Sequence, residues 1–196
     1  MVIPHGVYDL RAHLGYVSLG TSRDTSEFAV ASLLGWWREQ GRALYPEAEE
    51  LLLLCDGGGS NSARTYLFKQ DLLHFTAATG LRVRVAHYPP YTSKWNPIEH
   101  RLFPHLTRAC AGVVLTSVEL VRELMSGART VTGLEVKVQI LDKVYEKGRR
   151  VAEAVKEEIR YQAGQMRERT RLVYDEKLPR WNYRVFPEYV NVGDVI

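Results

Sequence analysis

The chain has 196 residues, of which 45% are hydrophobic and 25% are charged, and its formal net charge is +3. This composition, with 4 Trp and 11 Tyr residues, is typical of one globular domain with a sizeable core and excludes a disordered chain. No apolar run approaches the ~20 residues of a membrane span, and the first residues do not resemble a signal peptide. Cys55 and Cys110 lack the spacing of a zinc site or a disulfide framework, so we expect a reducing, cytoplasmic setting without membrane.

The first part of the chain predicts a strand pair followed by a helix. Val7–Leu10 and Tyr16–Leu19 are short β-prone runs, and Arg11–Gly15 is expected to join them as a turn. From Ser26, apolar residues recur at helical spacing as far as residue 40, so we predict a helix capped by Ser26 and ended by Gly41.

The middle of the chain alternates strand and helix signals. Leu51–Cys55 is a continuous apolar run, which is typical of a strand buried on both faces of a sheet. Arg64–Thr79 predicts a helix ended by Gly80, and Arg82–His87 alternates as a strand. This alternation predicts an α/β sheet with helices on its faces.

Two shorter helices are predicted next. Asn96 and Pro97 have the residue types of a helix cap and a first helical position, and Pro104 should kink or shorten the helix that they begin. Val118–Ser126 predicts another helix, capped by Ser117.

The remainder of the chain changes character. Leu134–Leu141 alternates like a strand, and Gly148–Arg171 predicts a charged helix. Residues 142–184 contain 12 Lys and Arg against 8 Asp and Glu, so they carry the basic excess. We therefore divide the chain into a core, residues 1–133, and an appendage, residues 134–196, made of a strand and a basic helical and aromatic part.

Two carboxylates stand at positions that favour catalysis. Asp56 follows the most apolar strand, and functional groups gather at the carboxyl ends of strands in α/β sheets. The three glycines after it allow the backbone to approach a ligand, and Asn61 is a candidate for a further polar contact. Glu99 lies in the first turn of the helix that begins at Pro97. If folding brings Asp56 and Glu99 together, they form the oxygen-rich site that Mg²⁺ or Mn²⁺ prefers.

Each of these features also has a purely structural interpretation. Asp56 and Gly57 form a good turn signal, and the spacing of Asn96 and Glu99 is that of a capping box. The six histidines are scattered, and only His100 adjoins a candidate residue. The simplest interpretation is packing for the two cysteines, for the Leu and Trp cluster near residue 36 and for the aromatic tail. The charged helix is most simply a face exposed to solvent.

Two blocks together resemble the insertion-sequence transposases of bacteria. These are Asp-Gly-Gly-Gly-Ser-Asn at 56–61 and His-Tyr-Pro-Pro-Tyr-Thr-Ser-Lys-Trp-Asn-Pro-Ile-Glu-His-Arg-Leu-Phe at 87–103. They resemble the core of the DDE superfamily, which includes mariner-type elements and retroviral integrases. The segments 4–10, 24–29 and 181–183 resemble the same bacterial branch.

The resemblance implies a ribonuclease-H-like fold, with a mixed five-stranded sheet flanked by helices. It implies that Asp56 and Glu99 are the second and third catalytic carboxylates and hold Mg²⁺ or Mn²⁺. The implied reaction is metal-dependent phosphoryl transfer, in which water cleaves the transposon end and the freed 3′-hydroxyl attacks target DNA. The implied partners are transposon-end and target DNA and further copies of the chain, at the bacterial nucleoid.

The same resemblance implies that the first catalytic aspartate lies on a strand upstream of Val7–Leu10. We therefore expect this chain to lack that strand and to be inactive alone, since Asp9 and Asp24 are poor substitutes by position. Loss of a central strand would expose backbone edges and apolar surface. We thus expect a poorly stable or aggregation-prone chain, or a gap filled by a second polypeptide, such as an upstream-encoded transposase half.

Two other functions remain open at this stage. A catalytically inactive remnant would bind DNA or a complete transposase and inhibit it. A ribonuclease-H-like nuclease would cleave generic hybrids without preference for transposon ends.

Overall fold

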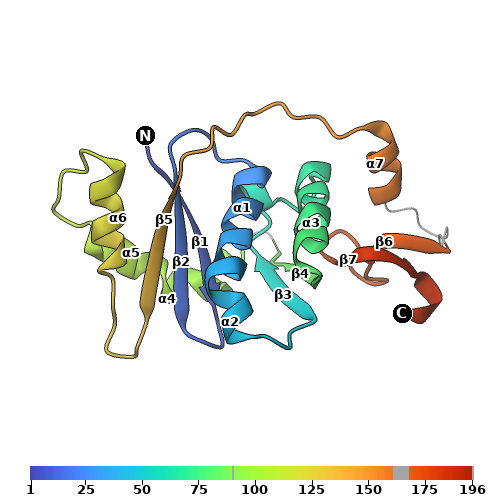
Figure 1. Cartoon of the computed structure of the whole chain (residues 1–196), viewed down its shortest axis with the longest axis horizontal. Helices are drawn as coiled ribbons and strands as arrows, with labels where there is room; N and C mark the ends of the chain where they lie inside the picture. Colours follow the sequence, from blue (N-terminus) through green and yellow to red (C-terminus); the bar gives the residue numbers. More distant parts are fainter. Residues whose placement is uncertain (90, 161–167, 196) are drawn as a thin grey trace.

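The computed structural model describes residues 1–89, 91–160 and 168–195, which form an elongated molecule of mixed strands and helices (Figure 1). The strands are β1 (Ile3–Asp9), β2 (Leu14–Gly20), β3 (Glu50–Cys55), β4 (Arg82–His87), β5 (Glu135–Leu141), β6 (Arg169–Tyr174) and β7 (Asn182–Asn191). The helices are α1 (Ser26–Trp36), α2 (Arg42–Leu44), α3 (Tyr66–Thr79), α4 (Ile98–Arg101), α5 (Phe103–Ala109), α6 (Val118–Ser126) and α7 (Glu153–Ile159). A π-helical turn covers Trp37–Gly41, and 3₁₀ turns cover Gly59–Asn61, Ser93–Trp95 and Val192–Asp194.

The strands form two mixed sheets. In the first, β1 is antiparallel to β2, and β2 is parallel to β5. In the second, β3 is parallel to β4, while β7 lies antiparallel between β4 and β6. The predicted α/β class is therefore confirmed and is consistent with a ribonuclease-H-like fold. The expected single sheet is wrong, because no ladder joins β1 to β3 among the described strands.

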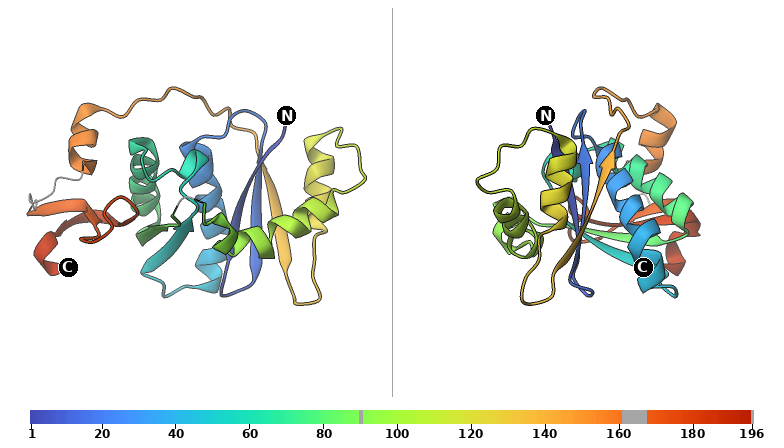
Figure 2. Two further views of the ribbon diagram at one scale, coloured as in Figure 1. Left: turned by 180° about the vertical axis from the view of Figure 1, so that it is seen from behind. Right: turned by 60° about the vertical axis from the view of Figure 1, so that its left-hand side comes forward.

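Helices cover both faces of the strands. Helix α1 packs against β1, β2 and α3 on one face, and α3 packs against β4 and β7 (Figure 1). Helices α4 and α5 cross behind the first sheet, on the face opposite α1 (Figure 2). Helix α6 lies against β5. The space between β1 and β3 therefore has α1 on one side and the α4–α5 pair on the other.

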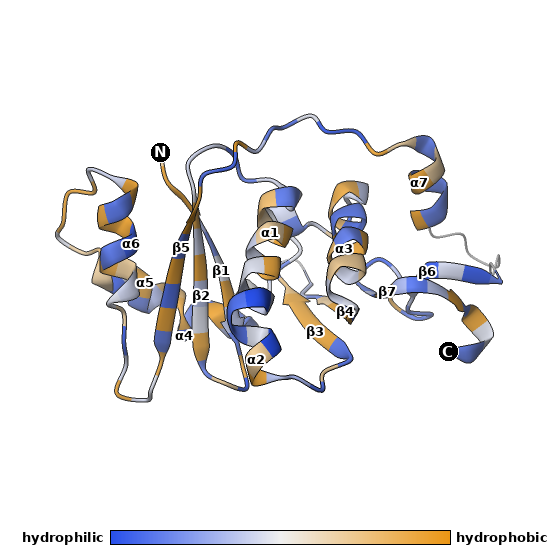
Figure 3. Ribbon diagram, viewed as in Figure 1, coloured by the Kyte–Doolittle hydropathy of each residue, from blue (hydrophilic) through white to orange (hydrophobic). Residues whose placement is uncertain are grey.

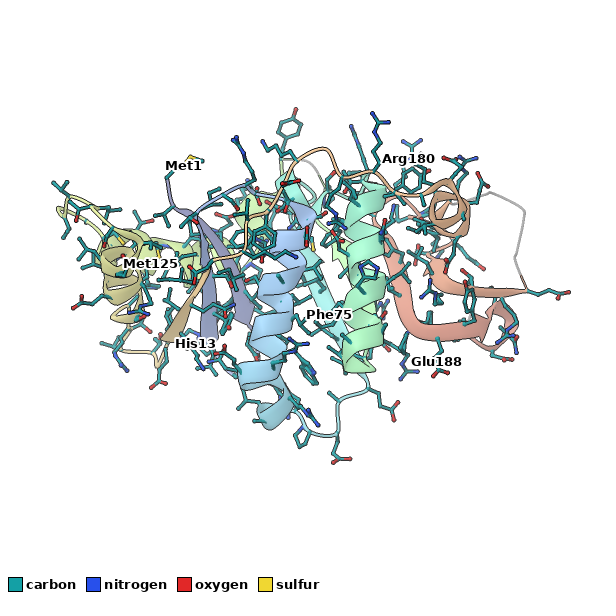
Figure 4. The ribbon with its side chains drawn as sticks, turned by 45° about the horizontal axis from the view of Figure 1, so that its top comes forward. Met1, His13, Phe75, Met125, Arg180 and Glu188 are labelled. Carbon is teal, nitrogen blue, oxygen red and sulfur yellow. The ribbon has the colours of Figure 1, made fainter. Side chains whose placement is uncertain are left out.

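The core consists of two clusters of buried side chains. The larger cluster joins α1, α3 and the second sheet, and its member Phe75, marked on α3 in Figure 4, is 1% exposed. The smaller cluster joins β2, α5 and α6. Strand β3 is apolar along most of its length (Figure 3), yet Leu52 is 57% exposed. The expectation that this strand is buried on both faces is therefore wrong, because the face that Leu52 shares with its exposed β4 partner, Arg84, is open to solvent.

Both ends of the first helix differ from the predicted ends because of local contacts. The cap is Thr25, whose hydroxyl accepts a hydrogen bond from the Phe28 amide (3.2 Å), whereas the Ser26 hydroxyl donates to Asp71 (2.7 Å). Gly41 does not end the helix, which continues to Leu44. Gly41 is buried with helical φ, and a Cβ there would lie 2.6 Å from the Trp37 ring, so the glycine permits close packing.

Several later boundaries follow the sequence signals. Gly80 ends α3 with a φ of 76°, and the Ser117 hydroxyl caps α6 by accepting from the Leu120 amide (3.1 Å). The helix containing Glu99 breaks at Leu102, and Pro104 lies in the first turn of α5, so the predicted interruption is confirmed.

The predicted charged helix over 148–171 is wrong in its extent. Helix α7 covers only Glu153–Ile159, and Arg169–Tyr174 pairs with β7 as a strand. Part of the prediction, residues 161–167, lies outside the described residues. The aromatic tail is packed, as expected, since Tyr183 on β7 is 2% exposed.

The segment after β5 contacts both the loop before α1 and helix α3. Residues 142–152 cross over α1 and α3 on the way to α7 (Figure 1). There Arg149 donates two hydrogen bonds to Asp71 of α3 (2.8 and 3.1 Å), and the Tyr145 amide donates to the Ser22 hydroxyl (2.9 Å). Strand β5 lies beside β2, and β7 lies beside β4, so both sheets contain strands from either side of residue 134. The division of the chain at that residue stays a prediction.

No helix in the described ranges is both long enough and apolar enough to cross a membrane.

Candidate active site between the two sheets

A cavity of about 760 Å³ separates β1 from β3. Its walls are the facing strands, residues 3–9 and 50–55, with α1 on one side and the start of α4 and α5 on the other. Both candidate carboxylates, Asp56 and Glu99, line this cavity.

Asp56 is held at the carboxyl end of β3 by the loop that follows it. The Tyr88 amide donates to the Cys55 carbonyl (2.7 Å) and closes the strand, and Gly57 turns the chain with a φ of 77°. The Gly58 amide donates to Asp56 Oδ1 (3.2 Å). With its amide oriented to suit both neighbours, Asn61 donates to the same oxygen (3.0 Å) and to the Gly58 carbonyl. The Asp56 carboxylate is exposed but fixed in direction.

Glu99 lies in the first turn of α4. Its amide donates to the carbonyl of Asn96 (3.1 Å), and Pro97 precedes the first helical residue. No side chain caps this helix in the described structure, so the prediction of Asn96 as a side-chain cap is wrong. Asn96 is instead buried, 8% exposed, and lines the cavity. Glu99 is half-buried at the same wall.

The charges of Asp56 and Glu99 are not neutralised by neighbouring cations. Within the described ranges, neither residue takes part in an ion pair with Lys, Arg or His. The structure thus brings two negative side chains to one cavity without internal compensation. Such a site attracts a cation.

Two further residues lie near Asp56. His5 of β1 and Asp24 of the loop before α1 line the cavity, and a Cβ on Gly59 would lie 3.6 Å from Asp24 Oδ2. Burial lowers the pKa of His5, and the negative charges of Asp24 and Asp56 oppose that change. No sequence pattern points to His5, a single histidine in a strand, and the position of Asp24 in a turn predicts only a poor substitute for a catalytic residue.

Asp9 has a different environment. Its carboxylate accepts hydrogen bonds from the amides of Arg11 (3.0 Å) and Ala12 (2.9 Å) and from the Tyr45 hydroxyl (2.9 Å). Asp9 therefore shapes the turn between β1 and β2, at the end of the cavity away from Asp56.

Two buried basic side chains, His87 and Lys69, contact backbone carbonyls of the loop after Asp56. His87 is 6% exposed, and its ring nitrogens lie 2.9 Å from the Trp181 carbonyl and 3.0 Å from the Asn61 carbonyl. A neutral ring can donate to only one of these two acceptors, and burial lowers the pKa of His87. Lys69 donates to the Ala63 carbonyl (3.0 Å) and lies over the rings of Tyr174 and Tyr183.

The donor set suits a hard divalent cation only in part. Carboxylate and amide oxygens are the ligands that Mg²⁺ and Mn²⁺ prefer, and Mg²⁺ is often held by one or two carboxylates together with substrate phosphates. Across residues 1–89, 91–160 and 168–195, no group of three His, Cys, Asp or Glu side chains is arranged to hold a metal. The cavity thus offers Asp56 and Glu99 as ligands but not a complete site.

An exposed aromatic and basic surface adjoins Glu99. Tyr91 is fully exposed and Trp95 is 68% exposed, and the Lys94 ammonium lies 5.3 Å from the Trp95 ring centre. Arg101 is exposed at the end of α4. Aromatic rings beside unpaired cations are the groups with which proteins contact bases and phosphates.

The chain matches a known protein family. A family model described as the Rhodopirellula transposase DDE domain matches residues 1–187. No curated protein and no solved structure matches the chain.

Proposed function

Because this chain belongs to the Rhodopirellula transposase DDE domain family, we propose that it is the catalytic domain of a DNA transposase. The proposed reaction is metal-dependent cleavage of a phosphodiester and transfer of the freed strand end to target DNA. The observation that carries the proposal is that Asp56 and Glu99 both line one cavity and take part in no ion pair in the described structure.

We assign Asp56 and Glu99 to divalent metal binding, with Mg²⁺ or Mn²⁺ as the ion. When bound, such an ion polarises the phosphodiester and stabilises the charge that develops on its oxygens. Asn61 orients Asp56 through its hydrogen bond to Oδ1, and the Asn96 carbonyl fixes the first turn that carries Glu99. These residues are positioning residues, since they act through the two carboxylates.

The DNA would lie over the exposed surface beside Glu99. Lys94 and Arg101 can contact phosphates, and Trp95 offers a ring on which an unpaired base can stack. The partners that we propose are transposon-end DNA, target DNA and further copies of the chain, in the bacterial cytoplasm.

We also propose that residues 1–196 are inactive alone. The cavity carries two suitable carboxylates, and the family resemblance implies a third on a strand that precedes β1 in the sequence. The resemblance, and not the cavity, is the basis for that part of the proposal.

The test is cleavage and strand transfer on duplexes that end in the terminal repeats flanking the gene, with Mn²⁺ as the metal. We expect activity when the chain is expressed with the polypeptide encoded directly upstream, and none with Asp56→Asn or Glu99→Gln. If either variant were as active as the unsubstituted chain, the proposal would be contradicted. Salt-sensitive binding without cleavage under both conditions would favour an inactive DNA-binding remnant. Cleavage of generic RNA–DNA hybrids without end preference would favour a nuclease.

A further inference from the structure

The cavity between β1 and β3 is bordered on each side by the hydrogen-bonding edge of a strand. Strand β1 pairs on one side with β2, and β3 pairs on one side with β4. Their other edges, in the described structure, have no ladder partner and face the same cavity over residues 3–9 and 50–55. We propose that this slot binds one extended β-strand of polypeptide from outside residues 1–196. The inference needs neither DNA nor metal, so it does not depend on the proposed function.

The two edges run in opposite directions. The start of β1 lies near the end of β3: the His5 ring lies 5.9 Å from the ring of Phe28 in the first turn of α1, and α1 contacts the Gly59–Asn61 turn that follows β3. The end of β1 lies near the start of β3, because Asp9 accepts a hydrogen bond from Tyr45, which is just ahead of β3 (2.9 Å). A strand parallel to β3 is therefore antiparallel to β1. It would join the two sheets into one, with the order β5-β2-β1-strand-β3-β4-β7-β6.

Both faces of the slot are apolar. Val30, Leu33 and Trp36 of α1 line one side, and Ile98 and Phe103 line the other. A strand between two helical layers is buried on both faces and consists largely of Val, Ile and Leu. The occupant is therefore an apolar segment of six or seven residues, the lengths of β3 and β1. It would span roughly 20 Å at ~3.3 Å per residue.

The edge of β3 that faces the cavity belongs to an apolar strand. Leu52 is 57% exposed, and Leu51 and Leu53 are only partly buried, although the run is as apolar as a central strand (Figure 3). A long apolar edge left open to water is a site for pairing with another chain. Insertion of a strand would cover this edge and satisfy its amides and carbonyls, which is the recognition mode of β-strand addition.

The polarity of the slot allows a direct test. An occupant parallel to β3 ends beside the start of β1, so a two-residue Asn-Gly turn can connect it to Met1. The test chain is the full protein with a strand of Val and Ile residues as long as β1 and an Asn-Gly turn added before Met1. The matched control carries the same addition with two central residues replaced by Pro, which cannot donate to a ladder.

Amide hydrogen exchange, without DNA or metal, is the measurement. We expect exchange to slow at least ~10-fold in both β1 and β3 with the apolar addition and to stay unchanged with the Pro control. If the added strand prevents folding, the same pair of sequences, flanked by Lys, is supplied as synthetic peptides to the unmodified chain, with the same expectation.

Three results would overturn the inference. The first is slower exchange at one edge only, which would mean that the slot does not accept a strand between both edges. The second is equal slowing by the apolar and Pro sequences. The third is a concentration-dependent dimer of the unmodified chain in which β1 and β3 are already protected, since a second copy would then be the occupant. Loss of DNA cleavage would not bear on any of these readouts.

Discussion

Asp56, in the loop after β3, and Glu99, in the first turn of α4, both line the cavity between β1 and β3. Strand β3 and helix α4 are separated in the sequence by α3 and β4, so the parallel pairing of β3 with β4 is what brings the two residues to the same edge. In the proposed function, a divalent ion shared by the two carboxylates gives them a role beyond that of a turn and a helix terminus.

The hydrogen bond from Asn61 to Asp56 should strengthen metal binding. Asn61→Ala removes the donor that fixes Oδ1, so we expect the affinity for Mn²⁺ to fall about 10-fold, as for other groups that orient a ligand. Titration calorimetry measures the change. Asn191→Ala is the matched control, since Asn191 bonds to Asp194 away from the cavity (3.1 Å). An unchanged affinity in Asn61→Ala would contradict the positioning role.

Trp95 should contribute to DNA binding through its exposed ring. Trp95→Ala is expected to weaken binding of single-stranded or frayed ends by about 1–3 kcal/mol, the usual value of one stacked base. Trp95→Phe should retain most of the affinity. Tyr189→Ala removes an aromatic that is 50% exposed on β7 and should have no effect. Fluorescence anisotropy at fixed salt distinguishes these variants, and equal affinity of Trp95→Ala and the wild type would disprove the contact.

Lys69 should make stability depend on pH above neutrality. Burial lowers the pKa of Lys69 from 10.5 to about 8, so the unfolded chain binds more protons than the folded chain between these values. The contribution of Lys69 to the free energy of unfolding therefore rises with pH across that interval and is least favourable below about pH 8. Lys69→Met removes the effect.

The quantity to compare is the free energy of unfolding of Lys69→Met minus that of the wild type. We expect this difference to be about 2 kcal/mol larger at about pH 7.5 than at about pH 10. Urea unfolding at both pH values measures the difference, and the loss of the bond to Ala63 cancels in the comparison. Tyr174 and Tyr183 titrate in both proteins, with pKa values raised by burial. The same stability difference at the two pH values would contradict the account of Lys69.

Arg149 should stabilise the packing of the segment after β5. Asp71 is 3% exposed, and Arg149→Met would leave this buried carboxylate with only the Ser26 hydroxyl as a donor among its described contacts. We expect the free energy of unfolding to fall by about 1–3 kcal/mol, because unsatisfied buried acceptors are costly. Arg150→Met alters a neighbouring exposed arginine and should change stability little. Similar stability of both variants would show that the contact contributes nothing.

The sequence predicted those features that depend on local chemistry. Gly80 ends α3 because its positive φ favours glycine, and Ser117 caps α6 because its hydroxyl satisfies a free amide. The apolar run of β3 and the position of Asp56 after it followed from the same kind of signal. These features are set by neighbouring residues, so a single sequence contains them.

The features that were missed depend on tertiary contacts. Gly41 packs against Trp37 inside a continuing helix, so a residue that often ends helices does not end this one. Arg169–Tyr174 becomes a strand because β7 offers it an edge, although its charges suited a helix. His5 reaches the site because β1 lies across the cavity from β3, a relationship that no spacing of residues reveals.

The most direct test is whether one bound ion affects both the loop after Asp56 and the first turn of α4. In backbone amide spectra, Mn²⁺ should broaden the signals of residues 57–61 and 96–100 together, and Asp56→Asn should abolish the broadening in both segments. Glu119→Gln, an exposed change on α6, should leave the broadening intact. Broadening confined to one segment, or unaffected by Asp56→Asn, would contradict a shared metal site.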